Sequence, residues 1–354
     1  MTPCLVYYIL STAFSLSSGN VNRSAFLGNI LQTALLWKDP LMLGGNDDVD
    51  VVLPLRWLPI AGCLAVSVLV DEQFRYLAVV DTGSPFLTAP ADIALYCTRS
   101  ERRYPPTVEQ YGETAAPMTW RKTRQILVGG VQSVTPCRVG VVTDELRQDT
   151  GGLFCGLIWK DDARPTFLQQ ARRSCFTIDY AARTLTLRST TRPWGLAGKA
   201  GGTDALDMYD LSPYGPDLYH YAVEATEMTI FTDKGDFSIL DPSTTTTRPI
   251  VVVIDTGLTG CIVSDSLVND GCLPVPISSI RGARLRLGAG TTSSSCVVLT
   301  SEDRYWNLAC FRLPWFDDEQ NHPHIVAVGA TFLRNCKLDV DAKHSRIQLQ
   351  NLQS

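Results

Sequence analysis

Two short tripeptides carry the residues best suited to chemistry in this 354-residue sequence. Asp81-Thr82-Gly83 and Asp255-Thr256-Gly257 each follow a β-branched run, with two apolar residues directly before the aspartate. One such tripeptide is an ordinary strand-ending turn, because aspartate bonds its own backbone and glycine supplies a positive φ. Two by chance are rarer than about one in a hundred in a chain of this length. The repetition therefore indicates a pair of related turns.

Paired carboxyl groups can hydrolyse an amide without a metal ion or a covalent nucleophile. One group takes a proton from water, and the other gives a proton to the substrate. Two carboxyl groups held about 3 Å apart cannot both ionise, so they share one proton. Glycine lets the backbone approach each carboxylate closely, and a threonine hydroxyl can bond across to the opposite turn. We predict that Asp81 and Asp255 form such a pair, whose apparent pKa values belong to both residues together.

The surrounding sequence is predicted to be mostly β. From residue 50 onward, runs of roughly four to eight β-branched and aromatic residues alternate with turn residues, and long helical periods are scarce. The halves also repeat one another, since an apolar-apolar-Gly element follows each tripeptide: Phe154-Cys155-Gly156 and Ala327-Val328-Gly329. A stretch rich in Gly, Pro and Thr, about 189–216, lies between the halves. This duplication predicts two related units.

On these motifs the sequence resembles the pepsin-like family of aspartic peptidases, over about residues 50–354. Asp81-Thr82-Gly83-Ser84 is similar to the first active-site loop of the family, and Asp255-Thr256-Gly257 to the second. Tyr111-Gly112 falls where the family has its flap hairpin, and residues 328–349 resemble its closing segment. The resemblance implies a bilobal pepsin-like fold, with the active-site cleft between two related β-rich lobes.

The resemblance also implies an activity, that of an aspartic endopeptidase acting on polypeptide substrates without a cofactor. Asp81 and Asp255 would be the catalytic residues and would polarise a water molecule between them. Ser84 would bond the outer oxygen of Asp81, and Tyr111 with Gly112 would close over the substrate. The residues expected to support the active site are Thr82, Gly83, Ser84, Thr256 and Gly257, the two threonines bracing the loops across the pair.

One departure from the family concerns the second aspartate. Leu258 stands where Ser84 stands in the first loop, so the hydroxyl that usually bonds this aspartate is missing unless Thr259 reaches it. A lost bond to a carboxylate would raise the pKa of the pair, because ionisation becomes less favourable. We expect activity with a changed pH profile.

The predicted flap departs from the family as well. Thr88 stands where many members carry a tryptophan that bonds the flap tyrosine, and Trp120 would be the substitute for that tryptophan. The flap has no glycine-rich tip, and Glu113 and Pro117 would stiffen it.

Other functional classes fit less well. A catalytically silent, peptidase-like binding or inhibitor protein is the main alternative, which Leu258 favours and the two intact tripeptides oppose. A serine hydrolase is disfavoured because no G-x-S-x-G turn occurs. A metallopeptidase or a zinc site is disfavoured because neither H-E-x-x-H nor a zinc-finger spacing occurs, and no metal is expected.

The sequence pattern of the N-terminal region differs from that of the rest of the chain. Residues 1–18 contain an apolar stretch suited to a signal peptide, although an organelle-targeting leader or a first buried element are alternatives. Residues 19–50 form a short leader or pro-like segment, 51–190 the N-terminal lobe with the first tripeptide, and 191–354 the C-terminal lobe with the second. We expect a secretory, extracellular or vacuole-like compartment, or else an organelle such as a plastid.

Composition limits the partners. Hydrophobic residues make up 45% of the chain, charged residues 19%, and the net charge is −5, so no basic surplus exists for binding nucleic acid. No apolar run is long enough to span a membrane, and we expect none in the mature protein. Eleven cysteines suggest disulfides, with at least one left unpaired unless Cys4 is removed. Both aspartates lie on one chain, so we expect a monomer.

Overall fold

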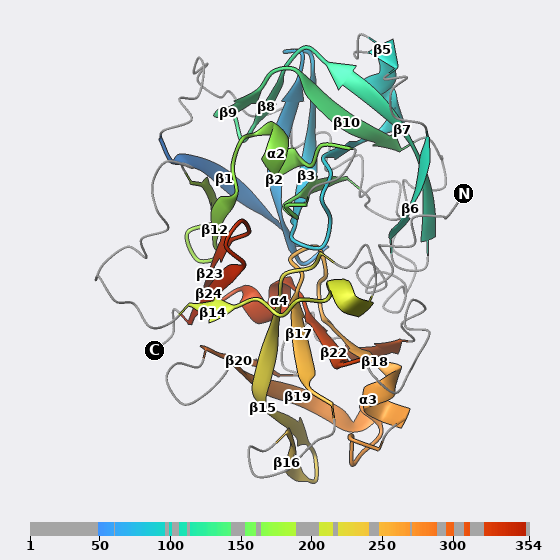
Figure 1. Ribbon diagram of the computed structural model, residues 1–354, viewed down its shortest axis with the longest axis vertical. Helices are drawn as coiled ribbons and strands as arrows, with labels where there is room; N and C mark the ends of the chain where they lie inside the picture. The colour runs from blue at the N-terminus through green and yellow to red at the C-terminus, as the bar shows by residue number, and fades with distance from the viewer. Residues whose placement is uncertain are drawn as a thin grey trace.

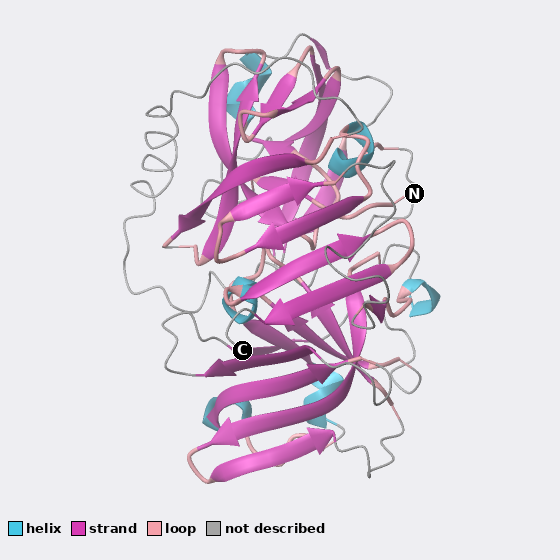
Figure 2. Ribbon diagram, turned by 90° about the vertical axis from the view of Figure 1, so that its left-hand side faces the viewer, coloured by secondary structure: helices cyan, strands magenta, loops and turns pink. Residues whose placement is uncertain are grey.

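The computed structural model describes residues 49–351 except 60, 96–98, 101–105, 112–113, 143–152, 161–163, 189–204, 215–218, 241–247, 270, 289–294, 301–307 and 312–321. The predicted leader and pro-like segment lie outside these residues. The described part is mostly β, as the sequence predicts, and its strands form three sheets (Figures 1 and 2).

The largest sheet joins strands from both halves of the chain. Its path runs β11-β3-β2-β1-β13-β12-β23-β24-β14, and β8 and β9 extend it beside β2. Antiparallel pairing of β12 with β23 makes the connection between the halves, with Phe176 opposite Val340. The strands are β1 (Val51–Leu58), β2 (Cys63–Val70), β3 (Phe74–Asp81), β8 (Ile126–Val128), β9 (Gln132–Val134), β11 (Phe154–Gly156), β12 (Cys175–Asp179), β13 (Thr184–Leu187), β14 (Leu206–Asp207), β23 (Cys336–Asp341) and β24 (Arg346–Asn351).

A second sheet belongs to the first half alone. It has the path β4-β10-β7-β5, with β6 paired to β7. Its strands are β4 (Thr88–Ala89), β5 (Arg99–Ser100), β6 (Thr107–Tyr111), β7 (Thr114–Thr123) and β10 (Cys137–Val142). The β6-β7 pair is a hairpin that closes with Tyr111 opposite Thr114, so the backbone forms a hairpin where the flap was predicted.

The third sheet belongs to the second half and lies in the lower part of Figure 1. Its path is β20-β19-β15-β17-β22-β18-β21, with β16 paired to β15. Its strands are β15 (Ala222–Thr232), β16 (Gly235–Leu240), β17 (Ile250–Ile254), β18 (Cys261–Ser264), β19 (Ile280–Leu287), β20 (Ser295–Thr300), β21 (Leu308–Phe311) and β22 (His324–Val328).

Sequence patterns explain the burial of these strands. All five residues of β17, Ile-Val-Val-Val-Ile, are buried, as expected for a strand with parallel pairing that is covered on both faces. β19 instead exposes Arg281, Arg284 and Arg286 and buries the aliphatic residues between them, which is the alternation of a half-buried strand. One apolar cluster includes residues from both halves, among them Leu53 and Leu338.

Helices are few and short in the described part. They are α2 (Phe167–Gln170), α3 (Asp265–Asn269) and α4 (Ala330–Leu333), with the 3-10 turns η2 (Ala91–Leu95), η4 (Ser212–Tyr214) and η5 (Ile277–Ser279). None of the helices in the described ranges has the length and apolar character needed to cross a bilayer.

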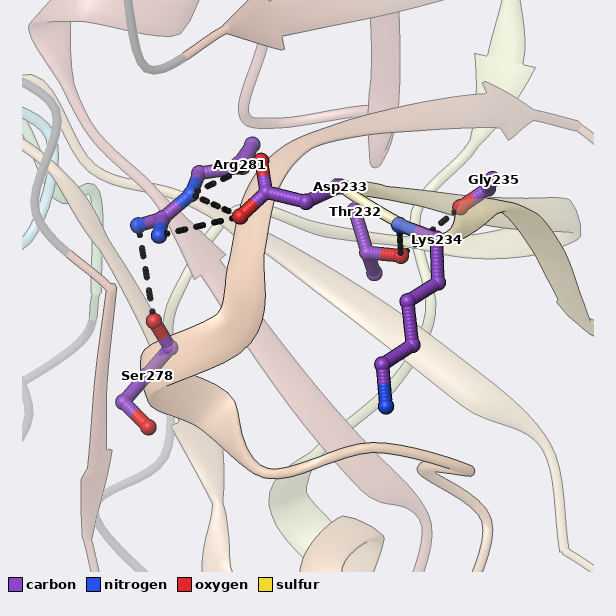
Figure 3. Close-up of polar contacts among 6 residues, drawn as sticks. All are labelled: Thr232, Asp233, Lys234, Gly235, Ser278 and Arg281. Atoms are coloured by element: carbon purple, nitrogen blue, oxygen red, sulfur yellow. Dashed lines mark hydrogen bonds and ion pairs between the residues drawn. The ribbon is translucent and has the colours of Figure 1, made fainter.

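The tip of the β15-β16 hairpin shows how an ordinary turn is built in this protein (Figure 3). The Lys234 N–H donates to Thr232 Oγ1 at 3.1 Å, and that hydroxyl donates to the Gly235 carbonyl at 2.9 Å. Arg281 forms an ion pair with Asp233 at 3.3 Å, but both side chains are exposed, so the pair contributes little to stability.

The cysteines behave as buried apolar residues. Seven of them are described, none of these forms a disulfide, and all but Cys272 are buried. The disulfides suggested by the sequence are therefore not found in the described part, and the other four cysteine side chains lie outside it. Burial raises the pKa of the Cys63, Cys175 and Cys261 thiols to about 12, which keeps them protonated and unreactive.

Candidate active site

Each of the two aspartates begins the same kind of turn at the end of a buried strand. Asp81 is the last residue of β3, and Asp255 directly follows β17. The Gly83 N–H donates to Asp81 Oδ1 at 2.7 Å, and the Gly257 N–H donates to Asp255 Oδ1, also at 2.7 Å. The Leu258 N–H adds a longer bond of 3.3 Å to the same Asp255 oxygen. These backbone donors hold each carboxyl group in a fixed orientation.

Reciprocal threonine bonds join the two turns. The Thr82 N–H donates to Thr256 Oγ1, and the Thr256 N–H donates to Thr82 Oγ1, both at 3.0 Å. The hydroxyls then donate across the pair, from Thr82 to the Ile254 carbonyl at 2.8 Å and from Thr256 to the Val80 carbonyl at 2.6 Å. All four bonds are buried, so water does not compete for them. Turns separated by 174 residues are thereby locked together.

The two carboxyl groups lie within hydrogen-bonding reach of one another. Asp255 is fully buried and Asp81 is 4% exposed. Burial, and after it the negative charge of Asp81, raises the pKa of Asp255 well above its usual range. Burial also raises the pKa of Asp81, against hydrogen bonds that lower it. Two buried acids at this separation retain one proton between them over the range in which free carboxyl groups are ionised.

The two aspartates are not supported equally. The Ser84 hydroxyl is close enough to lower the pKa of Asp81, although no hydrogen bond within 3.5 Å forms. Asp255 Oδ2 is buried and receives no hydrogen bond from the described residues. A proton held between this oxygen and an oxygen of Asp81 would satisfy it, which agrees with a shared proton.

Leu258 and Thr259 do not supply the missing hydroxyl. Leu258 is 1% exposed and packs in an apolar cluster of the second half. Thr259 Oγ1 donates to the Ala61 carbonyl at 2.6 Å and lies 3.7 Å from the Cys63 thiol. The alternative that Thr259 bonds Asp255 is therefore wrong, because that hydroxyl is committed to a carbonyl of the first half.

Two glycines let a second strand pass directly behind each turn. β11 pairs in parallel with β3, with Gly156 opposite Asp81, and β22 pairs in parallel with β17. A Cβ atom at Gly156 would lie 2.5 Å from the Ser84 carbonyl oxygen, and one at Gly329 would lie 2.4 Å from that of Leu258. The apolar-apolar-Gly repeat of the sequence thus performs the same packing task in both halves.

An aromatic wall follows the first turn. The rings of Phe86 and Trp120 meet edge to face at 4.9 Å between centroids, and Phe154 packs beside them. Thr88 Oγ1 accepts the Phe154 N–H at 2.6 Å, which is a bond internal to this wall. The predicted contact of Trp120 with Tyr111 stays a prediction, because the Tyr111 side chain and Gly112 lie outside the description.

Two buried basic residues near the turns were not identified from the sequence. Lys160 is 4% exposed and His220 is 5% exposed. Their segments are held together by Tyr221, whose hydroxyl donates to the Leu157 carbonyl at 2.6 Å and accepts the Trp159 N–H at 3.1 Å. Their positions in the sequence could have pointed to them, because Lys160 follows Gly156 closely and His220 precedes a strand of the second half.

Across the residues that the structure describes, no three His, Cys, Asp or Glu side chains are grouped so that they could hold a metal ion.

Comparisons with known proteins add no family to this picture. No model of a protein family matches the chain, and no curated protein matches it.

Proposed function

We propose that this protein is an aspartic endopeptidase with a bilobal, pepsin-like arrangement, and that Asp81 and Asp255 form its catalytic pair. The observation that carries the proposal is the joining of two equivalent Asp-Thr-Gly turns by reciprocal threonine bonds, with their buried carboxyl groups in mutual reach. The parallel strand behind each turn supports two related units.

The mechanism follows from the shared proton. In the singly protonated pair, the ionised carboxyl group accepts a proton from a water molecule as that water attacks the peptide carbonyl carbon. The protonated carboxyl group donates its proton to the carbonyl oxygen, and a proton then passes to the leaving nitrogen as the C–N bond breaks. The backbone donors at Gly83 and Gly257 need not move during these steps, so the site is preorganised.

A catalytically silent binding protein is the second candidate, and Leu258 is the feature that favours it. Both readings predict the same fold, so that only activity separates them. Cleavage of denatured globin between acidic and neutral pH, with and without a pepstatin-type inhibitor, makes the distinction. An inhibitor-sensitive activity supports the peptidase.

Replacement of either aspartate tests the assignment directly. Asp81→Asn and Asp255→Asn each should reduce kcat by roughly a hundred- to ten-thousandfold, because each removes one partner of the acid-base pair. Asp233→Asn is the matched control, since Asp233 is an exposed carboxylate at a hairpin tip (Figure 3). Inhibitor-sensitive cleavage that persists at the normal rate in both active-site variants would refute the proposal.

Asp255→Asn can also be tested without substrate, by measuring the stability of the folded protein. Because the pKa of Asp255 is raised by burial, the folded state binds more protons than the unfolded state above about pH 4, and the unfolding free energy falls as pH rises. Asp255→Asn removes this penalty. Its Tm should exceed that of the unmodified protein by about 2–5 °C at neutral pH, and the difference should vanish below about pH 4.

A further inference from the structure

His220 lies level with the second aspartate. In the β15-β17 pair, Ala222 is opposite Val253, and the Ile254 N–H donates to the Tyr221 carbonyl at 2.9 Å. The same register, continued two residues beyond the Ala222–Val253 pair, brings the backbone of His220 level with Asp255. Successive side chains alternate between faces, so His220 shares the face of Ala222, while Tyr221 points the other way toward Leu157. The imidazole thus lies on the face of the β15-β17 pair that carries Ala222, at the level of Asp255 along the strands.

This imidazole is buried without a hydrogen-bond partner. Neither Nδ1 nor Nε2 of His220 has one among the residues that the structure describes, and the residue is 5% exposed. Buried polar atoms are almost always satisfied by protein, water or ligand, so this imidazole has hydrogen-bonding capacity that a ligand can use.

A buried cation lies next to this imidazole. Lys160 Nζ is 5.2 Å from the centre of the Tyr219 ring and 5.9 Å from that of the Phe86 ring. The ammonium group is therefore close both to the first active-site loop, through Phe86, and to the residue that precedes His220. The Arg164 guanidinium group also lies over the Phe86 ring, 4.7 Å from its centre. Burial, and then the charge of Lys160, lowers the pKa of His220 to about 4.

We propose that Lys160 and His220 form a subsite that binds the carboxylate of an acidic substrate side chain next to the scissile bond. A carboxylate can accept the imidazole N–H, and its charge is favoured by the nearby ammonium group. An apolar side chain in the same place leaves both ring nitrogens unsatisfied. The inference rests on the proposed function, because it assigns the substrate preference of that same site.

The test uses pairs of peptide substrates that differ only by Glu or Gln at one position flanking the cleaved bond. At about pH 5.5 a glutamate side chain is ionised. The unmodified protein should cleave one Glu peptide with a kcat/KM roughly five- to a hundredfold above that of its Gln counterpart. In Lys160→Met and His220→Leu this ratio should fall to near one, because kcat/KM for the Glu peptide drops.

Matched variants separate recognition from structural damage. Lys234→Met removes an exposed lysine at the β15-β16 hairpin and should leave the ratio unchanged (Figure 3). His220→Gln keeps a donor and an acceptor and should restore part of the preference, which a packing role would not predict. Thermal unfolding checks that each variant is folded. If His220→Leu does not fold, Lys160→Met and His220→Gln together test the subsite.

The outcomes for the two proposals differ. Cleavage with no Glu preference, or with a preference that Lys160→Met and His220→Gln leave intact, overturns the subsite and leaves the peptidase standing. Absence of any inhibitor-sensitive cleavage overturns both.

Discussion

At the scale of single residues, Asp255 depends on the backbone for its hydrogen bonds. Its Oδ1 accepts the N–H groups of Gly257 and Leu258, whereas Asp81 also has the Ser84 hydroxyl nearby. Burial, followed by the negative charge of Asp81, raises the pKa of Asp255 well above its usual range. The asymmetry follows from one side chain, since Leu258 packs into the apolar cluster instead of facing the carboxyl group.

Leu258→Thr should therefore move the pH profile. A hydroxyl that donates to the ionised carboxylate lowers the pKa of the pair, so both limbs of the rate profile should shift to lower pH by about one unit. Leu258→Val is the control, because valine has the shape of threonine without the hydroxyl and shares its loss of packing. Rate profiles that coincide for the two variants would contradict this role.

The residues of the proposed active site were predictable to different extents. Asp81, Asp255, Thr82 and Thr256 were predicted because the tripeptide pattern is local and its repetition is improbable by chance. His220 was not, because its position opposite Asp255 arises from the pairing of strands whose residues are far apart in the sequence. The alternative that Thr259 bonds Asp255 was wrong, because the Thr259 hydroxyl donates to the Ala61 carbonyl. No local sequence pattern reveals that contact.

At the scale of elements, each Asp-Thr-Gly turn is backed by a strand that needs a glycine. β11 and β22 bring Gly156 and Gly329 against the carbonyl groups of the turns. The sequence predicted both elements as a repeat, but the spacing of apolar residues does not reveal parallel pairing with β3 and β17.

Gly156→Ala tests this packing. The added Cβ would lie 2.5 Å from the backbone of Ser84, so the first turn must shift, and we expect a loss of about 1–3 kcal/mol in unfolding free energy together with at least a tenfold loss of kcat. Gly235→Ala provides the contrast, because its Cβ would meet nothing within 4 Å although its φ of +120° is strained. That variant should lose stability and keep its activity; equal activity losses in both would contradict the argument.

At the scale of the whole molecule, the two halves share a sheet and are held there by a buried carboxylate. Asp339 in β23 accepts a hydrogen bond from Thr177 in β12, and Arg188 donates to the same oxygen at 3.2 Å. Asp339 is 3% exposed. The sequence marked Asp339 only through its resemblance to a closing segment, and its partners could not be predicted because they belong to the other half.

Asp339→Ala should destabilise both halves together. Removing the acid leaves Arg188 without this partner in a partly buried position, and we expect a loss of about 3 kcal/mol in unfolding free energy. Denaturant unfolding followed by fluorescence and by activity should give one coincident transition at a lower midpoint. Asp339→Asn, which keeps an acceptor, should lose less. Two separate transitions would show that the halves unfold independently.

The buried thiols have a practical consequence for how this molecule can be studied. No covalent link closes a loop between the described cysteines, so regaining the structure of this part requires neither an oxidant nor disulfide exchange. A thiol-alkylating reagent can reach groups such as Cys63, Cys155 and Cys261 only after the surrounding sheets have opened. The rate of alkylation of these side chains therefore measures how often the core opens.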